Sequence, residues 1–357
     1  MKIRKVLSGS WAMVCILILI IDSKTALEGA SKGVSMCVQT VIPSLFPFLF
    51  LSSQITGIWM GQSIRFFRPV SRFMGIPDGS ESILLNAFLG GYPSGALCVA
   101  DYRTQGYFSD YTAARLLPLC NNAGPAFIFG LAGAMFSRKG SGWTLWLIQI
   151  FSAVAASAFI PSACASPVRE NIRSNSSISR QLANTIKAME QICGWIILFR
   201  ILISFAEKWF LNKININLRV IIAGLMELTN GCCMLNLIAD ENTRLILCSG
   251  LLSAGGFCVF LQTNAIAQTV SFRLYFPVKL MQCGISVICA YLCTRLNLCL
   301  TAAVMSVTVL IILLIKKYMV IERKTMYNTN TISGGSIYAL SKKNRTRMRL
   351  LLIRRQA

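Results

Sequence analysis

Long apolar stretches separated by short polar ones run along most of the chain. Seven of them are candidate membrane-spanning helices, because the hydrocarbon core of a bilayer needs about 20 apolar residues per helical span. They cover residues 6–22, 36–58, 112–136, 143–165, 190–210, 273–296 and 298–316, and the segments 62–76, 82–100 and 219–264 are ambiguous. The pattern predicts an all-α integral membrane protein with about seven to nine spans.

Two of the ambiguous segments have features that separate them from ordinary spans. Arginines and aromatic residues recur at helical spacing in residues 62–76, which favours a helix lying in the membrane interface. Segment 82–100 is apolar enough to enter the membrane, but three glycines and Pro93 interrupt its centre between Gly90 and Gly95. Backbone groups freed by such a break must be satisfied by protein or by a wet cavity. We therefore expect a re-entrant helical hairpin here, with a kinked span as the alternative.

The order of elements repeats along the chain. Placing residues 82–101 over 243–262 aligns Gly95 with Gly256 and Asp101 with Gln262. Both halves then contain a span, an ambiguous helix, a broken hairpin and two spans, with 219–238 as the counterpart of 62–76. Interrupted apolar segments at corresponding positions of two halves are typical of inverted-repeat transporters. The sequence thus predicts an inverted-repeat, transporter-like helical bundle with two re-entrant hairpins.

Four parts follow from this organisation. Residues 1–30 are expected to form an N-terminal membrane helix that stays uncleaved, because Ser23–Ala26 is a poor signal-peptidase site. Residues 31–170 and 171–318 form the two repeats, and residues 319–357 form a basic cytoplasmic tail. An odd number of crossings would place this tail outside the cell, whereas a true span at 219–238 would return it to the cytoplasm; both alternatives stay open.

Charge is sparse and unevenly placed. Of 357 residues, 55% are hydrophobic and 13% charged, whereas about 25% is usual in soluble domains. The net charge is +22, and the segment Lys316–Ala357 alone holds eleven Lys or Arg and one Glu. Basic residues beside apolar spans mark the cytoplasmic side and contact anionic lipid headgroups. We therefore expect membrane lipid, and no nucleic acid, as the partner of the tail.

Residue types that support enzymatic, cofactor or metal chemistry are scarce. The chain has no histidine and 14 cysteines, none of them in a CxxC pair, which gives no support to zinc or iron–sulfur binding. Ser94 has no histidine to activate it and stands in no GxSxG motif. No glycine-rich phosphate loop is present. We predict a protein that is not an enzyme, with no catalytic residue, no metal and no cofactor.

Two motifs carry a resemblance to a known family. GGYPSGALCVADYRTQG (90–106) and ARLLPLCNNAGPAFIFG (114–130) resemble the sporulation integral membrane proteins of the YlbJ type, within the wider nucleoside-recognition or Gate-domain group. The second half agrees with the family pattern at Met226–Gly231 and between Gly255 and Gln262. The resemblance implies a role in endospore formation, particularly of the spore cortex, and no known substrate. Leu97 stands where the family often has a lysine.

Polar residues at the predicted breaks are the candidate site residues. Asn121 and Asn122 precede a Gly-Pro step that would unwind a span and expose carbonyl and amide groups able to bind a small polar solute or a cation. Asp101 and Glu227 are candidates because a charge inside a span costs about 2.5–3.5 kcal/mol on insertion scales. The residues predicted to bind substrate are Pro93, Ser94, Gly95, Asp101, Asn121, Asn122, Gly124, Pro125, Glu227, Asn230, Gln262 and Asn264.

Structural alternatives exist for each of these candidates. Asp101 is close in sequence to Arg103 and near Arg115, so a loop-end ion pair would explain it. Glu227 would be merely exposed if 219–238 were interfacial, and the amides could pair between helices. The predicted function is transport or sensing of a small solute needed for spore cortex formation, in the bacterial inner or forespore-associated membrane. A membrane scaffold that binds other sporulation membrane proteins, without transport, is the alternative.

Overall fold

The computed structural model describes residues 2–161 and 178–296, and every regular element in this part of the chain is helical. Six stretches there are long and apolar enough to cross a membrane. They are Ser23–Trp59, Asp110–Met135, Ser141–Ala158, Ile178–Trp209, Glu241–Ile266 and Tyr275–Arg295. The prediction of an all-α chain with several apolar spans is confirmed. The predicted span 298–316, the tail 319–357 and the end of the predicted span 143–165 lie outside the described residues.

The elements are short in the regions around the breaks and long elsewhere. In chain order they are α1 (Lys2–Ile21), α2 (Ser23–Met36), η1 (Cys37–Val41), α3 (Ile42–Trp59), η2 (Arg65–Phe67), α4 (Arg68–Met74), α5 (Ser82–Leu85), η3 (Asn86–Gly90), α6 (Ser94–Thr104), α7 (Asp110–Cys120), α8 (Pro125–Phe127), η4 (Ile128–Ala132), η5 (Gly133–Met135), α9 (Ser141–Ala158), α10 (Ile178–Trp209), η6 (Leu211–Lys213), α11 (Ile216–Met226), α12 (Leu228–Met234), η7 (Leu235–Leu237), α13 (Glu241–Ala254), α14 (Gly256–Ile266) and α15 (Tyr275–Arg295).

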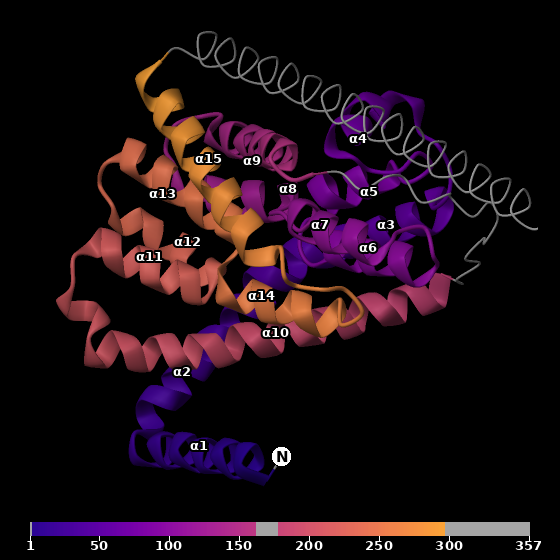
Figure 1. Cartoon of the computed structure of the whole chain (residues 1–357). Helices are drawn as coiled ribbons and strands as arrows, with labels where there is room; N and C mark the ends of the chain where they lie inside the picture. Colours follow the sequence, from indigo (N-terminus) through magenta and orange to yellow (C-terminus); the bar gives the residue numbers. More distant parts are fainter. Residues whose placement is uncertain (1, 162–177, 297–357) are drawn as a thin grey trace, which may run out of the picture. The chain divides into compact units, whose positions relative to one another are not determined.

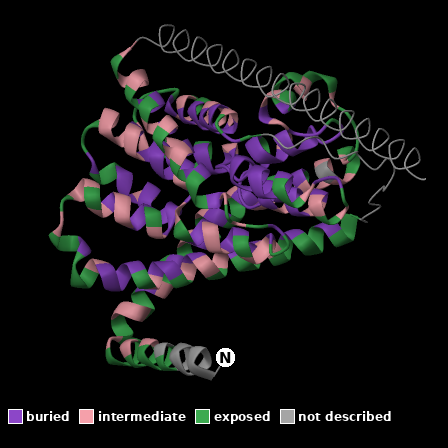
Figure 2. Ribbon diagram, in the orientation of Figure 1, coloured by how far each residue is buried: buried purple, intermediate pink, exposed green. Residues whose placement is uncertain are grey.

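Two groups of long helices frame the broken elements. Helix α10 packs along α2 and α3, and α15 packs against α13 and α9 (Figure 1). A Cβ on Gly29 would lie 3.0 Å from the Cα of Ile201, and one on Gly33 would lie 2.9 Å from the Cα of Ile197. Small residues allow membrane helices to approach this closely. Burial is greatest in the elements between these helices, whereas the described side chains of α1 are largely exposed (Figure 2).

The chain reverses direction between η3 and α6. Helix η3 ends at Gly90, Gly91 has a φ of 74°, and α6 begins at Ser94. The Ser94 hydroxyl donates to the Asn86 carbonyl at 3.4 Å, and a Cβ on Gly95 would lie 3.4 Å from the Cα of Ala87. Eight residues of continuous helix would instead span about 12 Å. The predicted break in 82–100 is confirmed, and we call this turn the first reversal.

The second reversal is at Glu227. Helix α11 ends at Met226, Glu227 has an extended backbone (φ −147°, ψ 119°), and α12 begins at the next residue. A Cβ on Gly231 would meet the backbone of Gly224 and lie 3.4 Å from the Val220 carbonyl oxygen. A continuous helix would separate residues 220 and 231 by roughly 16 Å, so α12 folds back along α11.

The expected hairpin at 243–262 differs from what the structure shows. Glu241–Ile266 is a helical stretch with one break, at Gly255 (φ 78°) and Gly256 (φ 74°), and its second part, α14, packs on α11, α10 and α6 rather than back on α13. Consecutive glycines open a helix here without a tight reversal, because they permit positive φ but do not by themselves set the direction of the following helix. The tight turn lies upstream, in 216–237.

Each reversal lies beside a broken helix of its own half. Asp110–Met135 is interrupted at residues 121–124, and a Cβ on Gly124 would lie 2.9 Å from the Cα of Gly91 in the first reversal. A Cβ on Gly256 would likewise lie 2.7 Å from the carbonyl oxygen of Gly224, which precedes the second reversal. Backbone meets backbone at both places, so glycine is needed there for close approach.

The segment 62–76 consists of the short helices η2 and α4. Phe66 is 83% exposed, whereas Met74 is fully buried. Arg115 of α7 donates from Nη1 to the Met74 carbonyl at 2.5 Å and from Nη2 to the Ser157 carbonyl at 3.1 Å. The segment is thereby attached to α7 and α9 on one side and presents aromatic surface on the other.

Candidate functional site

A small cavity lies between the two reversals, and we call it the central cavity. Its volume is about 20 Å³, close to the 10–15 Å³ that roughly one water molecule requires. It is lined by Val41, Leu45, Tyr92, Phe127, Ile192, Ile196, Glu227, Leu228, Thr229, Val259 and Gln262. The lining thus combines both reversals, both broken helices and the long helices α3 and α10. Elements from the two halves of the chain meet at this cavity.

Four polar residues, Tyr92, Glu227, Thr229 and Gln262, line the central cavity. The Tyr92 hydroxyl is buried and has no hydrogen-bond partner among the described residues. Gln262 is 5% exposed, and within the described part of the chain its amide donates only to the Sγ of Cys258, at 3.2 Å. Glu227 is 2% exposed. A buried polar group without a partner is uncommon in folded proteins and calls for an explanation such as a bound water or ligand.

Glu227 shapes the second reversal as well as facing the cavity. Its carboxylate accepts from the backbone N–H groups of Thr229 at 2.9 Å and Asn230 at 2.7 Å, and so caps α12. The Asn230 side chain donates to Glu227 at 2.6 Å and accepts from Arg200 of α10 at 2.9 Å. Asn230 therefore bridges the Arg200 guanidinium and the buried carboxylate by hydrogen bonds. Of the two interpretations open for Glu227, burial is correct and exposure is wrong.

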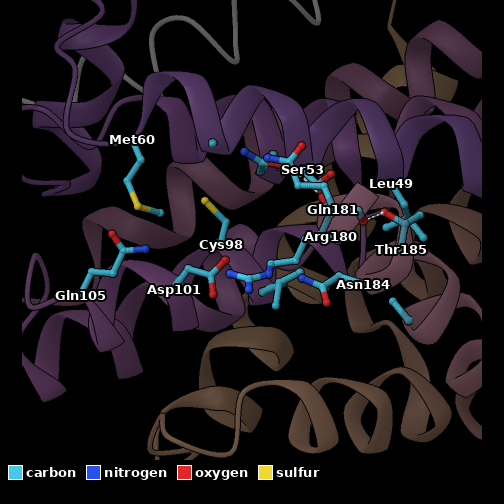
Figure 3. Close-up of a pocket in the computed structure, with 15 residues that line it drawn as sticks. Leu49, Ser53, Met60, Cys98, Asp101, Gln105, Arg180, Gln181, Asn184 and Thr185 are labelled. Atoms are coloured by element: carbon cyan, nitrogen blue, oxygen red, sulfur yellow. Dashed lines mark hydrogen bonds between the residues drawn. The ribbon is translucent and has the colours of Figure 1, made fainter. Parts of the chain in front are cut away.

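A larger cavity of about 270 Å³ opens between α3, α6 and α10, and we call it the α3/α10 pocket (Figure 3). Polar side chains from all three helices line it, among them Ser53, Asp101, Gln105 and Asn184. Burial raises the pKa of Asp101 to about 6. The charged partner of Arg103 is Asp110, at 2.7 Å. Arg103 therefore pairs with Asp110 and does not form the loop-end ion pair considered for Asp101.

The two cavities follow one another along α3 and α10. The α3/α10 pocket reaches Leu49 and Ala188, and the central cavity begins at Leu45 and Ile192. Each pair is four residues apart, which is one helical turn. Ser94, next to the first reversal, lines the α3/α10 pocket. The first reversal thus stands between the larger pocket and the central cavity.

A third polar region lies at the break between α7 and α8, and we call it the polar cluster. Asn121 donates to the Thr263 hydroxyl at 2.8 Å and to the Tyr275 hydroxyl at 2.9 Å. The Asn122 side-chain oxygen accepts from Gln282 of α15 at 2.8 Å. Further members are Gln149 of α9, Ser253 of α13 and Lys279 of α15. The cluster connects the break in the first half to helices of the second half.

The structure places the predicted site residues in several locations. Glu227 and Gln262 line the central cavity, Ser94 and Asp101 line the α3/α10 pocket, and Asn121 and Asn122 belong to the polar cluster. Pro93 and Gly124 lie at the breaks, Gly95 and Pro125 lie in the first residues of α6 and α8, and Asn230 donates to Glu227. Asn264 is exposed and lies apart from these locations.

Sequence reasoning missed two side chains that the structure brings to the fore. Tyr92 stands beside the predicted Pro93, but an aromatic residue in an apolar run gives no distinct signal. Lys279 is 4% exposed in α15. A lysine inside an apolar span is a functional candidate by itself, because charge there is costly, so this residue could have been found from the sequence.

Comparison with known proteins agrees with the membrane fold. No protein-family model matches the sequence. No solved structure matches it either. Over 145 residues the chain is 29% identical to the sporulation integral membrane protein YlbJ of Bacillus subtilis (strain 168), a match that covers 39% of this chain and 35% of that protein.

The match therefore spans about a third of the length of this curated relative. It confirms the resemblance to YlbJ-type proteins that the GYPSG and CNNAGP motifs indicate. Together with six apolar helices of sufficient length, it shows that the chain is a multi-pass integral membrane protein similar in part to a sporulation integral membrane protein.

Proposed function

We propose that the protein binds a small polar solute at the central cavity, in a state in which the reversals move apart and enlarge it, and transports or senses the solute during spore formation. The observation that carries this proposal is the meeting of both reversals at one cavity, where the buried Tyr92 hydroxyl has no partner among the described residues. Discontinuous helices of two halves that converge on a central site are the arrangement by which many transporters hold their substrates.

An inverted repeat with two re-entrant hairpins is part of the proposal. In the register that we propose, the first reversal corresponds to the second, so that Pro93 matches Glu227 and the break at 121–124 matches Gly255–Gly256. The starts of the broken helices fall within three residues of this register, since Ser109 caps α7 and Asp240 caps α13 through their side chains. Helices α9 and α15 then follow as corresponding spans.

The α3/α10 pocket is the proposed access route. It carries both signs of charge, from Asp101 and Arg180, together with several amides. Its volume of about 270 Å³ is close to the roughly 300 Å³ at the lower end for small-molecule sites. A solute entering here would reach the central cavity only if the first reversal or its neighbours moved. That movement is the proposed gating step.

The role in spore formation rests on the similarity to YlbJ. We propose that the solute is needed for formation of the spore cortex. A scaffold that binds sporulation membrane proteins would need neither a central cavity nor an unpartnered hydroxyl facing it. Uptake into proteoliposomes separates the two functions. We would test labelled adenosine, glutamate and spermidine as neutral, anionic and cationic probes.

Gln262→Leu and Asn264→Leu form the matched pair of variants. They remove an amide from the same helix, α14, but only Gln262 lines the central cavity. We expect uptake of at least one probe by the wild type, its loss in Gln262→Leu, and its retention in Asn264→Leu. Equal uptake by both variants would remove the central cavity from the mechanism. Absence of uptake for every probe, with a normal sporulation phenotype in Gln262→Leu, would favour the scaffold.

A further inference from the structure

We propose that the side chain of Lys279 occupies a monovalent-cation site at the break in the first broken helix, so that the chain supplies its own tethered cation there. This inference does not rest on transport, because it concerns how the polar cluster is held together.

The ammonium group of Lys279 is surrounded by neutral oxygen atoms. Its Nζ lies 2.5 Å from the main-chain oxygen of Asn121, 3.1 Å from Oε1 of Gln282 and 3.4 Å from Oδ1 of Asn122. An ammonium has three donors, and three acceptors are present. Among the described residues no carboxylate forms an ion pair with Lys279.

The break is what makes the first of these oxygens available. Asn121 follows the last residue of α7 with φ −96° and ψ 81°, outside the helical range. Its carbonyl therefore lies beyond the regular hydrogen-bonding of the helix and accepts from Lys279 instead. Main-chain carbonyls at unwound helices, with side-chain amide oxygens, are the groups with which membrane transporters coordinate Na⁺.

The surroundings of Lys279 favour a role for its charge over a purely structural role for its side chain. Among the described residues, the groups near Lys279 that can titrate are the thiols of Cys120 on α7 and Cys283 on α15, and the hydroxyl of Tyr275 adjoins it through Asn121. Helix α9 contributes the neutral amide of Gln149, and α14 contributes the Thr263 hydroxyl. A neutral amide or an apolar side chain would serve as a strut at lower cost than a lysine, whose charge in a span is unfavourable.

Removing the ammonium while leaving its space empty gives the decisive test. Lys279→Ala leaves the oxygen atoms of Asn121, Asn122 and Gln282 around an open space. Lys279→Met fills most of that space with an uncharged chain of similar length. We would measure the melting temperature of the full-length protein in detergent at constant ionic strength, replacing choline chloride by NaCl, KCl or methylammonium chloride.

We expect Lys279→Ala to gain a saturable increase of about 3–5 °C with at least one of these cations. The wild type and Lys279→Met should show no such increase. A folded Lys279→Ala without any cation response would overturn the proposal, and so would an equal response in Lys279→Met.

A second variant covers the case in which Lys279→Ala does not accumulate. Lys279→Ala combined with Gln282→Glu adds a carboxylate to the oxygen set and should bind a cation more tightly than the single variant. Its abundance in membranes should then depend on the cation supplied during growth. If no added cation restores accumulation of either variant, the site does not accept a free cation and the proposal is wrong.

Discussion

At the scale of single side chains, two amides at the breaks have different roles although their sequence patterns are alike. Sequence pattern predicts the same binding role for Asn121 and Gln262. In the structure Asn121 donates to two hydroxyl groups of the other half, whereas Gln262 faces the central cavity and donates only to a sulfur atom. The pattern identifies a break, but it cannot show which amides are already used in holding the halves together.

We therefore predict that Asn121→Leu lowers stability and Gln262→Leu does not. Loss of Asn121 leaves the hydroxyls of Thr263 and Tyr275 buried without their donor, which costs about 1–3 kcal/mol. The melting temperature and membrane abundance of Asn121→Leu should fall, while Tyr275→Phe, which removes one of the two hydrogen bonds, should show a smaller decrease. Equal stability of Asn121→Leu and wild type would contradict the structural role of Asn121.

Asp101 provides a prediction about pH. Burial raises its pKa from 3.8 to about 6, so the folded protein binds this proton more tightly than the unfolded chain does. Its contribution to stability therefore increases as the pH falls from 7 through 6 and levels off near the unfolded value of about 4. Asp101→Asn should lose this component, so the melting-temperature difference between variant and wild type should shrink toward pH 5. Asp78→Asn, at an exposed side chain, is the control and should follow the wild-type profile.

At the scale of elements, glycine and proline predict some breaks and miss another. The breaks at Gly91–Pro93, at 121–124 and at Gly255–Gly256 all carry residues that favour non-helical backbone. The second reversal has neither glycine nor proline at its turn, because Glu227 adopts an extended conformation and caps the next helix with its own carboxylate. A capping acid within an apolar run has the same sequence appearance as a charge in a span, so this turn was not predictable from composition.

Gly124 tests the contact between the first reversal and its broken helix. Its φ of −84° is open to any residue, so only the space around it is at issue. A Cβ there would lie 2.9 Å from the Cα of Gly91, and backbone at that distance must shift. We expect Gly124→Ala to lower stability by about 1–3 kcal/mol. Gly284→Ala, in α15 with no atom within 4 Å of the added Cβ, should be neutral or slightly stabilising, and equal effects would argue against close backbone contact.

For the whole molecule, hydropathy predicts the fold class but does not predict which residues of the two halves correspond to each other. The spans are predictable because lipid demands long apolar helices. Matching glycines predict that residues 82–101 correspond to residues 243–262. In the structure, the glycines of the first segment form a tight reversal, whereas those of the second open a spanning helix. Contacts such as Asn121 with Lys279 join residues of different halves, and no local pattern encodes them.

The number of spans bears on the predicted orientation of the tail. Six described stretches can span, and the predicted helices at 6–22 and 298–316 bring the number to eight, which is even. Lys208, near the end of α10, lies 2.5 Å from Asp22, just before α2, so these two helix ends share a side. With 216–237 folded back rather than spanning, both termini are expected in the cytoplasm, as the basic residues at each end favour.

Cysteine labelling of a variant freed of native thiols tests this orientation and the inverted repeat together. Asp78 and Thr104 flank the first reversal, Asn215 and Ala239 flank the second, and all four side chains are exposed. Because a re-entrant segment returns to the side from which it entered, each pair should label from one face. If the repeats are inverted, as we propose, the two pairs should label from opposite faces, with Asp78 and Thr104 cytoplasmic. Lys139 and Phe159, at the two ends of α9, are the spanning control and should label from opposite faces. Labelling of all four flanking positions from the same face would exclude the inverted repeat, while opposite labelling within a pair would convert that reversal into a span.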